Sequence, residues 1–528
     1  MAVPGDLDRS PASADRGRRH DATADQASGI TVVTDRGDLA GGWQGDVAVF
    51  RGVPYAAPPV GPARWRPPQP PPAWQGARPA TEFAAVPVQR QPRRNSIMFQ
   101  LNFADRRELT MSEDCLYLNI WSPEPERHAG LPVMVWLHGG GNRFGHGSQD
   151  IYDGRSLARQ GIVVVTLNYR LGALGFLAHP GLSRESPGHG SGNYALLDVV
   201  AALEWVQRNI AAFGGDPGRV TVAGNSAGAA FIAHLMAAQR SRGLFSQVIA
   251  QSSSGVYRAE GPMRSLAEAE AAGERFAAEV GCPDAAALRQ VSAVELMAAG
   301  DFGIVIDGRI VTADTQRAFE DGSQAACPMI VGTNLDDGAN YTPATAAAGL
   351  GAQANRLGEL AAGFRLVYPS ADPDQARASA RDFVSDSKFV FPVWQWAVTH
   401  EKTSGAPVWM YRFDREPPLP AGLVLAPPMD GGGYGVFHTA ELPYVFDSLG
   451  ARDWDWAQAD HHLARVMSAA WARFVATGDP SGGTTPSWPR FTGRDDADIM
   501  WFGAAVRTGP HDRIAAMRLH QARRGVPG

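Results

Sequence analysis

The sequence predicts an α/β protein with a mainly parallel central sheet flanked by helices, and two kinds of segment support this class. Residues Leu131–Leu137 and Gly161–Asn168 are nearly continuous apolar runs, which is typical of strands buried on both faces. Residues Tyr194–Ala212 carry apolar side chains at helical spacing and end at Gly214 and Gly215, a C-terminal helix signal. Because such segments alternate along the chain, we expect a doubly wound sheet.

The later elements continue this alternation. A helix is expected over Ala227–Ala238, and further strands over Val220–Gly224, Gln247–Gln251, Met329–Thr333 and Val408–Phe413. The segments around 255–302 and 341–400 are helix-rich by composition, so we expect helical insertions over one edge of the sheet. We therefore expect a single domain over residues 29–528, with cap-like segments at about 255–325 and 341–430.

The bulk composition is that of an ordinary globular chain of 528 residues, with 44% hydrophobic residues and a formal net charge of −6. This mild acidity gives no reason to expect nucleic acid or a membrane surface as a partner. Residues 1–28 lack the apolar core of a secretory signal, so we expect a disordered leader there. Cys115, Cys282 and Cys327 have neither a closed disulfide set nor metal-ligand spacing. We expect a cytoplasmic protein that is a monomer or a weak homodimer and uses no cofactor.

Residues Gly224–Gly228 place Ser226 between two glycines, at the junction of the expected strand and helix. This G-x-S-x-G pattern is typical of a nucleophile elbow, a tight turn that lifts the serine hydroxyl above the sheet edge. The alternative is a glycine-rich structural turn, which the strand–turn–helix context disfavours.

An oxyanion needs backbone N–H donors, and two segments can supply them. His138 and Gly139–Gly141 follow an apolar strand, and glycines allow close approach to a substrate oxygen. The second donor is the N–H of Ala227 at the start of the expected helix, where the dipole also favours negative charge.

The base is expected after the serine in the chain, preceded by an acid. His438 ends a glycine-rich loop that can deliver an imidazole to a rigid site, and we favour it over the other histidines that follow, His400, His461, His462, His511 and His520. Asp336 and Asp337 follow an expected strand. Only one of these neighbours can orient the histidine, and the residues alone do not decide between them.

Several longer stretches resemble the type B carboxylesterases, the group that also contains the cholinesterases, in its bacterial-type form. Besides the elbow they are Phe50–Ala56, Ser112–Asn119, Asn168–Gly172, Phe213–Pro217 and Phe437–Tyr444. The resemblance covers nearly the whole chain from about Gly29 and implies an α/β-hydrolase fold with a Ser–acid–His triad.

The resemblance also implies roles for single residues. The triad acid directly precedes the final glycine of its motif, which is Asp337 here, and Ser252 falls where relatives have a serine that supports this acid. The oxyanion-hole positions are Gly140, Gly141 and Ala227. Relatives form structural ion pairs at positions matched here to Arg51 with Glu113 and to Arg170 with Asp198.

The chain departs from the family in ways that affect chemistry. Neutral Asn225 replaces the glutamate that relatives usually carry before the nucleophile, so we expect Asn225→Glu to raise the acidic-limb pKa of kcat/KM. Val86 replaces a cysteine that bridges to the Cys115 position in relatives. No tryptophan lies between Val86 and Ser112, which disfavours choline esters. Four aromatic residues are candidates for an apolar pocket, with core packing as the alternative: Phe99, Phe103, Phe391 and Trp394.

The expected activity is therefore hydrolysis of carboxylic esters of apolar or aromatic small molecules through an acyl-enzyme on Ser226. An acyltransferase, lactonase or cyclase would use the same triad on a biosynthetic intermediate and is the first alternative. A non-catalytic binding protein of this fold is the second, although such proteins lack the serine.

Overall fold

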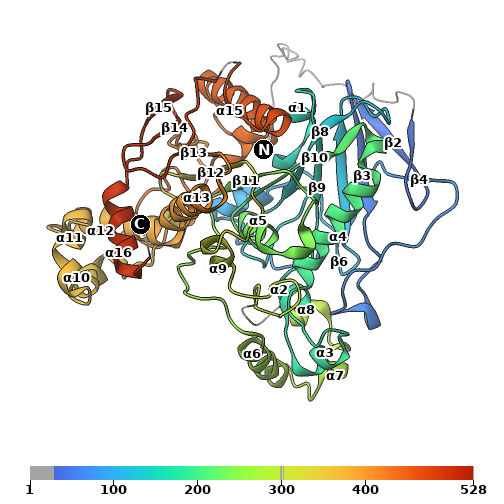
Figure 1. Ribbon diagram of the computed structural model, residues 1–528, viewed down its shortest axis with the longest axis horizontal. Helices are drawn as coiled ribbons and strands as arrows, with labels where there is room; N and C mark the ends of the chain where they lie inside the picture. The colour runs from blue at the N-terminus through green and yellow to red at the C-terminus, as the bar shows by residue number, and fades with distance from the viewer. Residues whose placement is uncertain (1–28, 298–299, 301, 484, 527–528) are drawn as a thin grey trace, which may run out of the picture.

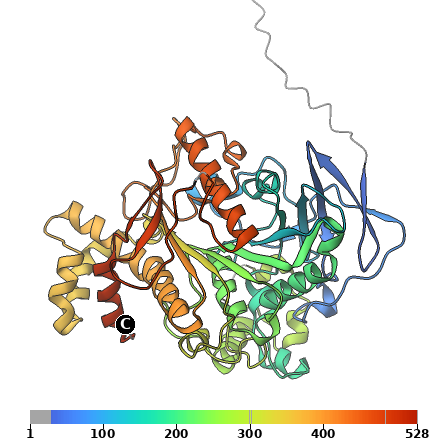
Figure 2. The same cartoon turned by 45° about the horizontal axis from the view of Figure 1, so that its top comes forward.

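The computed structural model describes residues 29–297, 300, 302–483 and 485–526; the expected leader, Met1–Ser28, lies outside them. Within these residues the centre is a sheet of 13 strands (Figures 1 and 2). Twelve strands follow one another across it in the order β1 (Ile30–Val33), β2 (Asp38–Gln44), β3 (Val47–Pro54), β7 (Tyr117–Ser122), β9 (Val163–Leu167), β8 (Leu131–Leu137), β10 (Gly215–Asn225), β11 (Gln247–Gln251), β12 (Met329–Asn334), β13 (Val408–Phe413), β14 (Asp498–Phe502) and β15 (Arg507–Pro510). Strand β4 (Ala77–Pro79) pairs with β2, and β5 (Val86–Pro87) pairs with β6 (Met111–Ser112) in a separate two-stranded sheet.

The sheet is parallel in its middle and antiparallel at its ends. The pairings between β9, β8, β10, β11, β12, β13 and β14 are all parallel. Strands β1, β2, β3 and β7 on one side, and β15 on the other, continue this order by antiparallel pairing. The mainly parallel sheet expected from the apolar runs is confirmed. The antiparallel end strands were not predicted, because strands such as β2 are glycine-rich and only partly buried, without a clear apolar run.

Helices cover both faces of the sheet (Figure 1). Along β8, Val133, Val135 and Leu137 join the core cluster that includes residues of α4 (Tyr194–Asn209) and α5 (Ala227–Ala237). Met134 and Trp136 join the cluster that includes residues of α15 (Gln458–Thr477). This alternation is why the strand reads as an uninterrupted apolar run. The longer helices of the described residues are α4 (Tyr194–Asn209), α5 (Ala227–Ala237), α6 (Leu266–Glu279), α10 (Ala346–Asn355), α12 (Pro373–Ser385), α13 (Phe391–Ser404), α15 (Gln458–Thr477) and α16 (Ile514–Arg524).

The two segments expected to be helix-rich are so in the structure. The first holds α6 and the short helices α7 (Ala285–Leu288) and α8 (Ala293–Leu296), and the second holds α10, α11 (Ala361–Val367), α12 and α13. Figure 1 shows α6, α7 and α8 grouped at one end of the molecule, and α10, α11 and α12 grouped beside α16. No helix of the described residues combines the length and apolar character needed to cross a bilayer.

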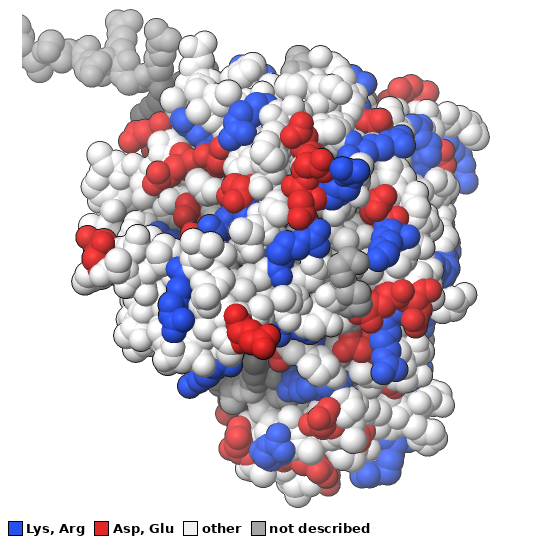
Figure 3. Space-filling view, turned by 60° about the vertical axis from the view of Figure 1, so that its left-hand side comes forward, with Lys and Arg blue, Asp and Glu red and all other residues white. Residues whose placement is uncertain are grey.

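One expected ion pair is wrong and the other is confirmed. Glu113 binds Arg64 rather than Arg51, with Arg64 Nε donating to Glu113 Oε2 at 2.7 Å. Arg51 instead donates to the Thr81 carbonyl and stacks on Phe83. Arg170 and Asp198 form the second expected pair, fully buried, with Nη2 2.6 Å from Oδ1. On the face in Figure 3, basic and acidic side chains are interspersed.

Candidate active site

The Ser226 turn joins β10 to α5 and has the strained backbone expected of a nucleophile elbow. Ser226 has φ 55° and ψ −121°, a conformation that non-glycine residues rarely adopt. A Cβ on Gly224 would lie 2.8 Å from the Gly228 carbonyl carbon, and a Cβ on Gly228 would lie 2.1 Å from the Leu137 carbonyl oxygen. The two glycines therefore let β8, β10 and α5 approach closely enough to form the turn.

The structure pairs His438 with Asp337, which the residues alone left open. His438 Nδ1 lies 2.9 Å from Asp337 Oδ1, and both side chains are buried. Asp337 Oδ2 accepts hydrogen bonds from Ser252 Oγ at 2.9 Å and from the Asn334 N–H at 2.8 Å. Asp336 points away and accepts from the Val436 N–H, so it shapes the loop that carries His438.

His438 has one ring nitrogen committed to Asp337 and one available. Its Nε2 is buried and has no hydrogen-bond partner within the described residues. The other candidate histidines lie away from this pair and make other contacts or are exposed. His400 contacts the Cys327 carbonyl, His520 contacts Tyr368, His511 is buried beside Asp512, and His461 and His462 lie exposed on α15.

A buried carboxylate, Glu441, lies behind the elbow and was not predicted. Glu441 Oε1 accepts from Asn225 Nδ2 at 2.8 Å and from Gln251 Nε2 at 3.0 Å, and Oε2 accepts from Asn334 Nδ2 at 2.6 Å. Burial, and then the nearby Asp337 carboxylate, raise the pKa of Glu441. Because all three contacts are N–H groups that donate hydrogen bonds to the carboxyl oxygens, the arrangement fits an ionised Glu441. The sequence shows that Glu441 lies three residues after His438, and this was the only hint of a role for it. Spacing along the chain does not show whether a side chain is buried.

The glycine loop after β8 lies against the elbow. An added Cβ on Gly139 would come within 3.1 Å of Ser226 Cβ, and Gly140 and Gly141 have φ values of 118° and 59°. The N–H groups of Gly140 and Gly141 donate to no acceptor among the described residues. Ala227 is the first residue of α5, where helix N–H groups also lack an internal partner. These three donor groups therefore remain free at the loop and at the helix start.

His138 holds the start of this loop without carrying charge. Burial lowers its pKa to about 4, and its Nδ1 lies 2.7 Å from the Gly139 carbonyl oxygen. Since that oxygen can only accept, Nδ1 carries the proton. The ring stacks on Tyr169 with centroids 4.2 Å apart, and the Tyr169 hydroxyl donates to the His138 carbonyl at 2.6 Å.

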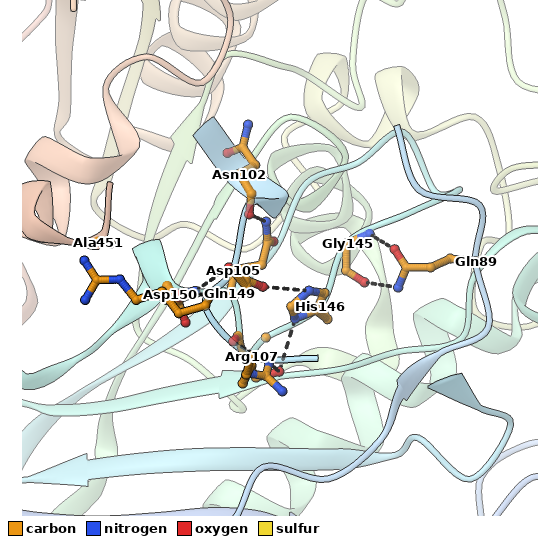
Figure 4. A network of polar contacts seen from close by, with 12 residues as sticks. Gln89, Asn102, Asp105, Arg107, Gly145, His146, Gln149, Asp150 and Ala451 are labelled. Carbon is orange, nitrogen blue, oxygen red and sulfur yellow. Dashed lines mark hydrogen bonds and ion pairs between the residues drawn. The ribbon is translucent and has the colours of Figure 1, made fainter. Parts of the chain in front are cut away.

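A second network fixes the far end of the loop (Figure 4). Gln89 exchanges two hydrogen bonds with the backbone of Gly145, at 2.7 and 3.0 Å. His146 Nε2 lies 3.4 Å from Asp105 Oδ2, and burial lowers the pKa of His146 well below its ordinary range. Asn102 Nδ2 donates to Thr439 Oγ1 at 3.0 Å, which links this network to the residue after His438.

Ser226 lines a cavity of about 300 Å³. Gly141, Ala227, Tyr341 and Phe389 line it too, and the ring centroids of Phe389 and Tyr341 lie 4.7 and 5.5 Å from that of His438. The cavity therefore brings together the serine, two of the expected oxyanion donors and the rings that cover His438. Within the described residues, no group of His, Cys, Asp or Glu side chains is arranged to hold a metal ion.

The four aromatic residues expected in a pocket do not line this cavity. Phe391 and Trp394 are fully buried in the core, which matches the alternative of core packing. Phe103 is buried against Phe144, and Phe99 lies one turn earlier in the same short helical segment. A π-helical turn at Asp386–Val390 precedes α13 and presents Phe389 rather than Phe391 to the site, a shift that no sequence pattern indicated.

Known proteins resemble this chain over nearly its full length. The model of the Carboxylesterase family matches residues 28–509. A fumonisin B1 esterase of Sphingopyxis macrogoltabida is 39% identical, over 89% of this chain and 85% of its own length. A para-nitrobenzyl esterase of Bacillus subtilis (strain 168) is 34% identical, over 87% and 92%. The crystal structure of a Geobacillus stearothermophilus carboxylesterase superposes with a TM-score of 0.76 at 33% identity, covering 92% of this chain and 99% of that one. The chain therefore belongs to the carboxylesterase family and is a carboxylic ester hydrolase with the α/β-hydrolase fold.

Proposed function

We propose that Ser226, His438 and Asp337 form the catalytic triad of this esterase. The observation that carries the proposal is the buried His438–Asp337 hydrogen bond beside a cavity lined by Ser226. Asp337 fixes the imidazole with Nδ1 protonated, so that Nε2 is free to take a proton. Ser252 and the Asn334 N–H hold Asp337 in place as positioning groups.

Hydrolysis then proceeds in two half-reactions. His438 Nε2 removes the Ser226 proton as Oγ attacks the ester carbonyl, and the same proton passes to the departing alkoxide when the acyl-enzyme forms. Water attacks the acyl-enzyme with His438 again as base, and the acid leaves as Ser226 regains its proton. The N–H groups of Gly140, Gly141 and Ala227 stabilise the oxyanion in both steps, and each such donor typically contributes about 3–4 kcal/mol.

The cavity and the comparisons support hydrolysis of small-molecule esters. Tyr341 and Phe389 form an apolar wall that suits an apolar or aromatic part of the substrate. The relatives reported above are named as esterases, which favours water as the acyl acceptor over an alcohol or amine. The three cysteines are free thiols, and this supports a reducing compartment such as the cytoplasm.

Replacement of the nucleophile tests the triad. Ser226→Ala removes the attacking oxygen, and we expect kcat for p-nitrophenyl acetate to fall by about 10⁴-fold or more. His438→Ala should cost a similar factor, because a triad acts as a unit. His461→Ala is the matched control, since His461 lies on the exposed face of α15 and should retain full activity. Wild-type rates in Ser226→Ala, or failure of the wild type to react covalently with a fluorophosphonate probe, would overturn the proposal.

A further inference from the structure

The cavity that contains Ser226 carries more positive than negative charge. Arg258, Arg264 and Lys388 line it, and Glu260 is the single carboxylate among its lining residues in the described part of the chain. His234 also lines it but is neutral, because burial lowers its pKa to about 3. A basic cavity stands out in a chain whose formal net charge is −6. Such a local excess attracts and orients an anionic ligand.

Lys388 places one of these charges beside the two rings that cover His438. Its Nζ lies 5.5 Å from the ring centroid of Tyr341 and 5.9 Å from that of Phe389, the two rings that also contact His438. Cation–π contacts hold the ammonium beside this wall. Lys388 is one of two lysines in the chain, the other being Lys402, which lies exposed near the end of α13.

Glu260 is shared between Lys388 and Arg258, so these two cations exceed it by one positive charge. Burial disfavours ionisation of Glu260, but Lys388, a backbone hydrogen bond and Arg258 together outweigh burial and lower the pKa of Glu260, so Glu260 is ionised at neutral pH. Lys388 Nζ lies 3.1 Å from Glu260 Oε1, in a pair whose side chains are 36% and 59% exposed. Exposed pairs of this kind contribute little and open easily. The Arg258 guanidinium makes no hydrogen bond or ion pair within the described residues that would satisfy it instead.

We propose that this enzyme prefers esters that carry a free carboxylate near the scissile bond, bound by Lys388 and Arg258 while the apolar part lies on Tyr341 and Phe389. The inference rests on the proposed role of Ser226, because it makes this cavity the substrate site. A carboxylate meets the excess positive charge, and the rings accept the chain or ring that links it to the ester. The carboxylate belongs to either the acid or the alcohol part of the ester.

Two matched substrate pairs test the proposal and separate the two sources. For the acid side, mono(4-nitrophenyl) adipate is compared with 4-nitrophenyl methyl adipate, with release of nitrophenol as the readout. For the alcohol side, 4-acetoxybenzoate is compared with 4-acetoxybenzamide. We expect the anionic member of at least one pair to have the higher kcat/KM, by about tenfold at low ionic strength, with the ratio falling as salt screens the charges.

Variants then assign the preference to the cavity. Lys388→Met keeps the apolar stem and removes the charge, so kcat/KM for the preferred anionic ester should fall about tenfold, mainly through KM, with less than a twofold change for its neutral partner. Arg258→Met should act in the same direction, and Lys388→Arg should retain the preference. Lys402→Met is the matched control and should change neither ester.

The outcomes are distinct for the two proposals. Equal or faster hydrolysis of the neutral ester in both pairs, or equal losses on both esters in Lys388→Met, would overturn the carboxylate preference and leave the triad intact. Failure to hydrolyse any of the four esters, together with failure of a fluorophosphonate to label Ser226, would instead remove the triad proposal on which the preference rests.

Discussion

Asn225 and Glu441 together decide which charge lies next to Ser226. The neutral Asn225 side chain donates to Glu441 Oε1 at 2.8 Å, so the elbow already has a buried carboxylate behind it. Because the amide orients the carboxylate and adds no charge of its own, the local charge is that of Glu441 alone. This contact was invisible in the sequence, where residue 225 seemed to set the charge by itself.

The same contact changes the expected effect of Asn225→Glu. Two buried carboxylates in contact share one proton, so their joint charge stays close to that of Glu441 alone. We therefore expect the acidic-limb pKa of kcat/KM to move by less than about 0.3 units, instead of rising. A pH–rate profile between pH 4 and 8 measures this. A rise of half a unit or more would mean that both carboxylates ionise, as the sequence alone suggested.

Helix α15 depends on a single buried acid at its start. Asp460 accepts from the Ala457 N–H at 2.9 Å, from the Tyr444 hydroxyl at 2.8 Å and from Arg415 Nε at 2.7 Å. Burial disfavours its ionisation, but the hydrogen bonds outweigh burial and hold its pKa below the ordinary range. The helix packs its apolar face on the sheet, so this acid ties the first turn to the rest of the fold.

A lowered pKa makes this stabilisation depend on pH. The contribution of Asp460 is fully present above its unfolded pKa of about 3.9 and is lost as pH falls through the lower folded value. Asp460→Asn should lower the thermal midpoint at pH 6, by the loss of about 1–3 kcal/mol of hydrogen bonding, and the difference from wild type should narrow at pH 3. Differential scanning fluorimetry at both pH values measures it.

The control for this prediction is an acid in an exposed pair. Asp496 binds Arg494 on the surface, where both side chains are 73% exposed, so Asp496→Asn should leave the midpoint nearly unchanged at both pH values. A difference between Asp460→Asn and wild type that stays constant from pH 6 to pH 3 would contradict the role given to Asp460.

On the scale of the whole molecule, Arg64 joins the N-terminal strands to the helical insertion. Besides Glu113, its Nη1 donates to the carbonyls of Arg289 and Val291, at 3.2 and 2.7 Å, in the segment after α7. One buried guanidinium thus links its own segment to two other distant parts of the chain. Removing it leaves a half-buried carboxylate and two carbonyls without their donors.

Arg64→Met should therefore destabilise the protein by roughly 2–4 kcal/mol, because it leaves the Glu113 carboxylate without its counter-charge. Arg51→Met is the matched comparison. Arg51 makes one exposed hydrogen bond and a ring contact, so its replacement should cost less. Chemical denaturation, followed by tryptophan fluorescence, compares the two. An equal or larger loss in Arg51→Met would contradict the assignment of the Glu113 partner.

The sequence alone was sufficient for features that local pattern determines. The buried strands β8 and β9 lie within the apolar runs predicted for them, because a strand covered on both faces is nearly apolar throughout. The strained turn at Ser226 was also predicted, since the two flanking glycines are required wherever β8, β10 and α5 approach so closely.

Only the tertiary structure showed the contacts that form where distant segments of the chain pack together. Asp337, which the family resemblance implied, contacts His438, whereas Asp336 accepts from the loop backbone, a difference that the residues alone left open. The structure placed Glu441 behind Asn225, Arg64 on Glu113, and Phe389 and Lys388 at the site in place of the buried Phe391 and Trp394. Spacing along a chain determines which face of an element a residue occupies, but the partner of that face is set by how the elements pack together.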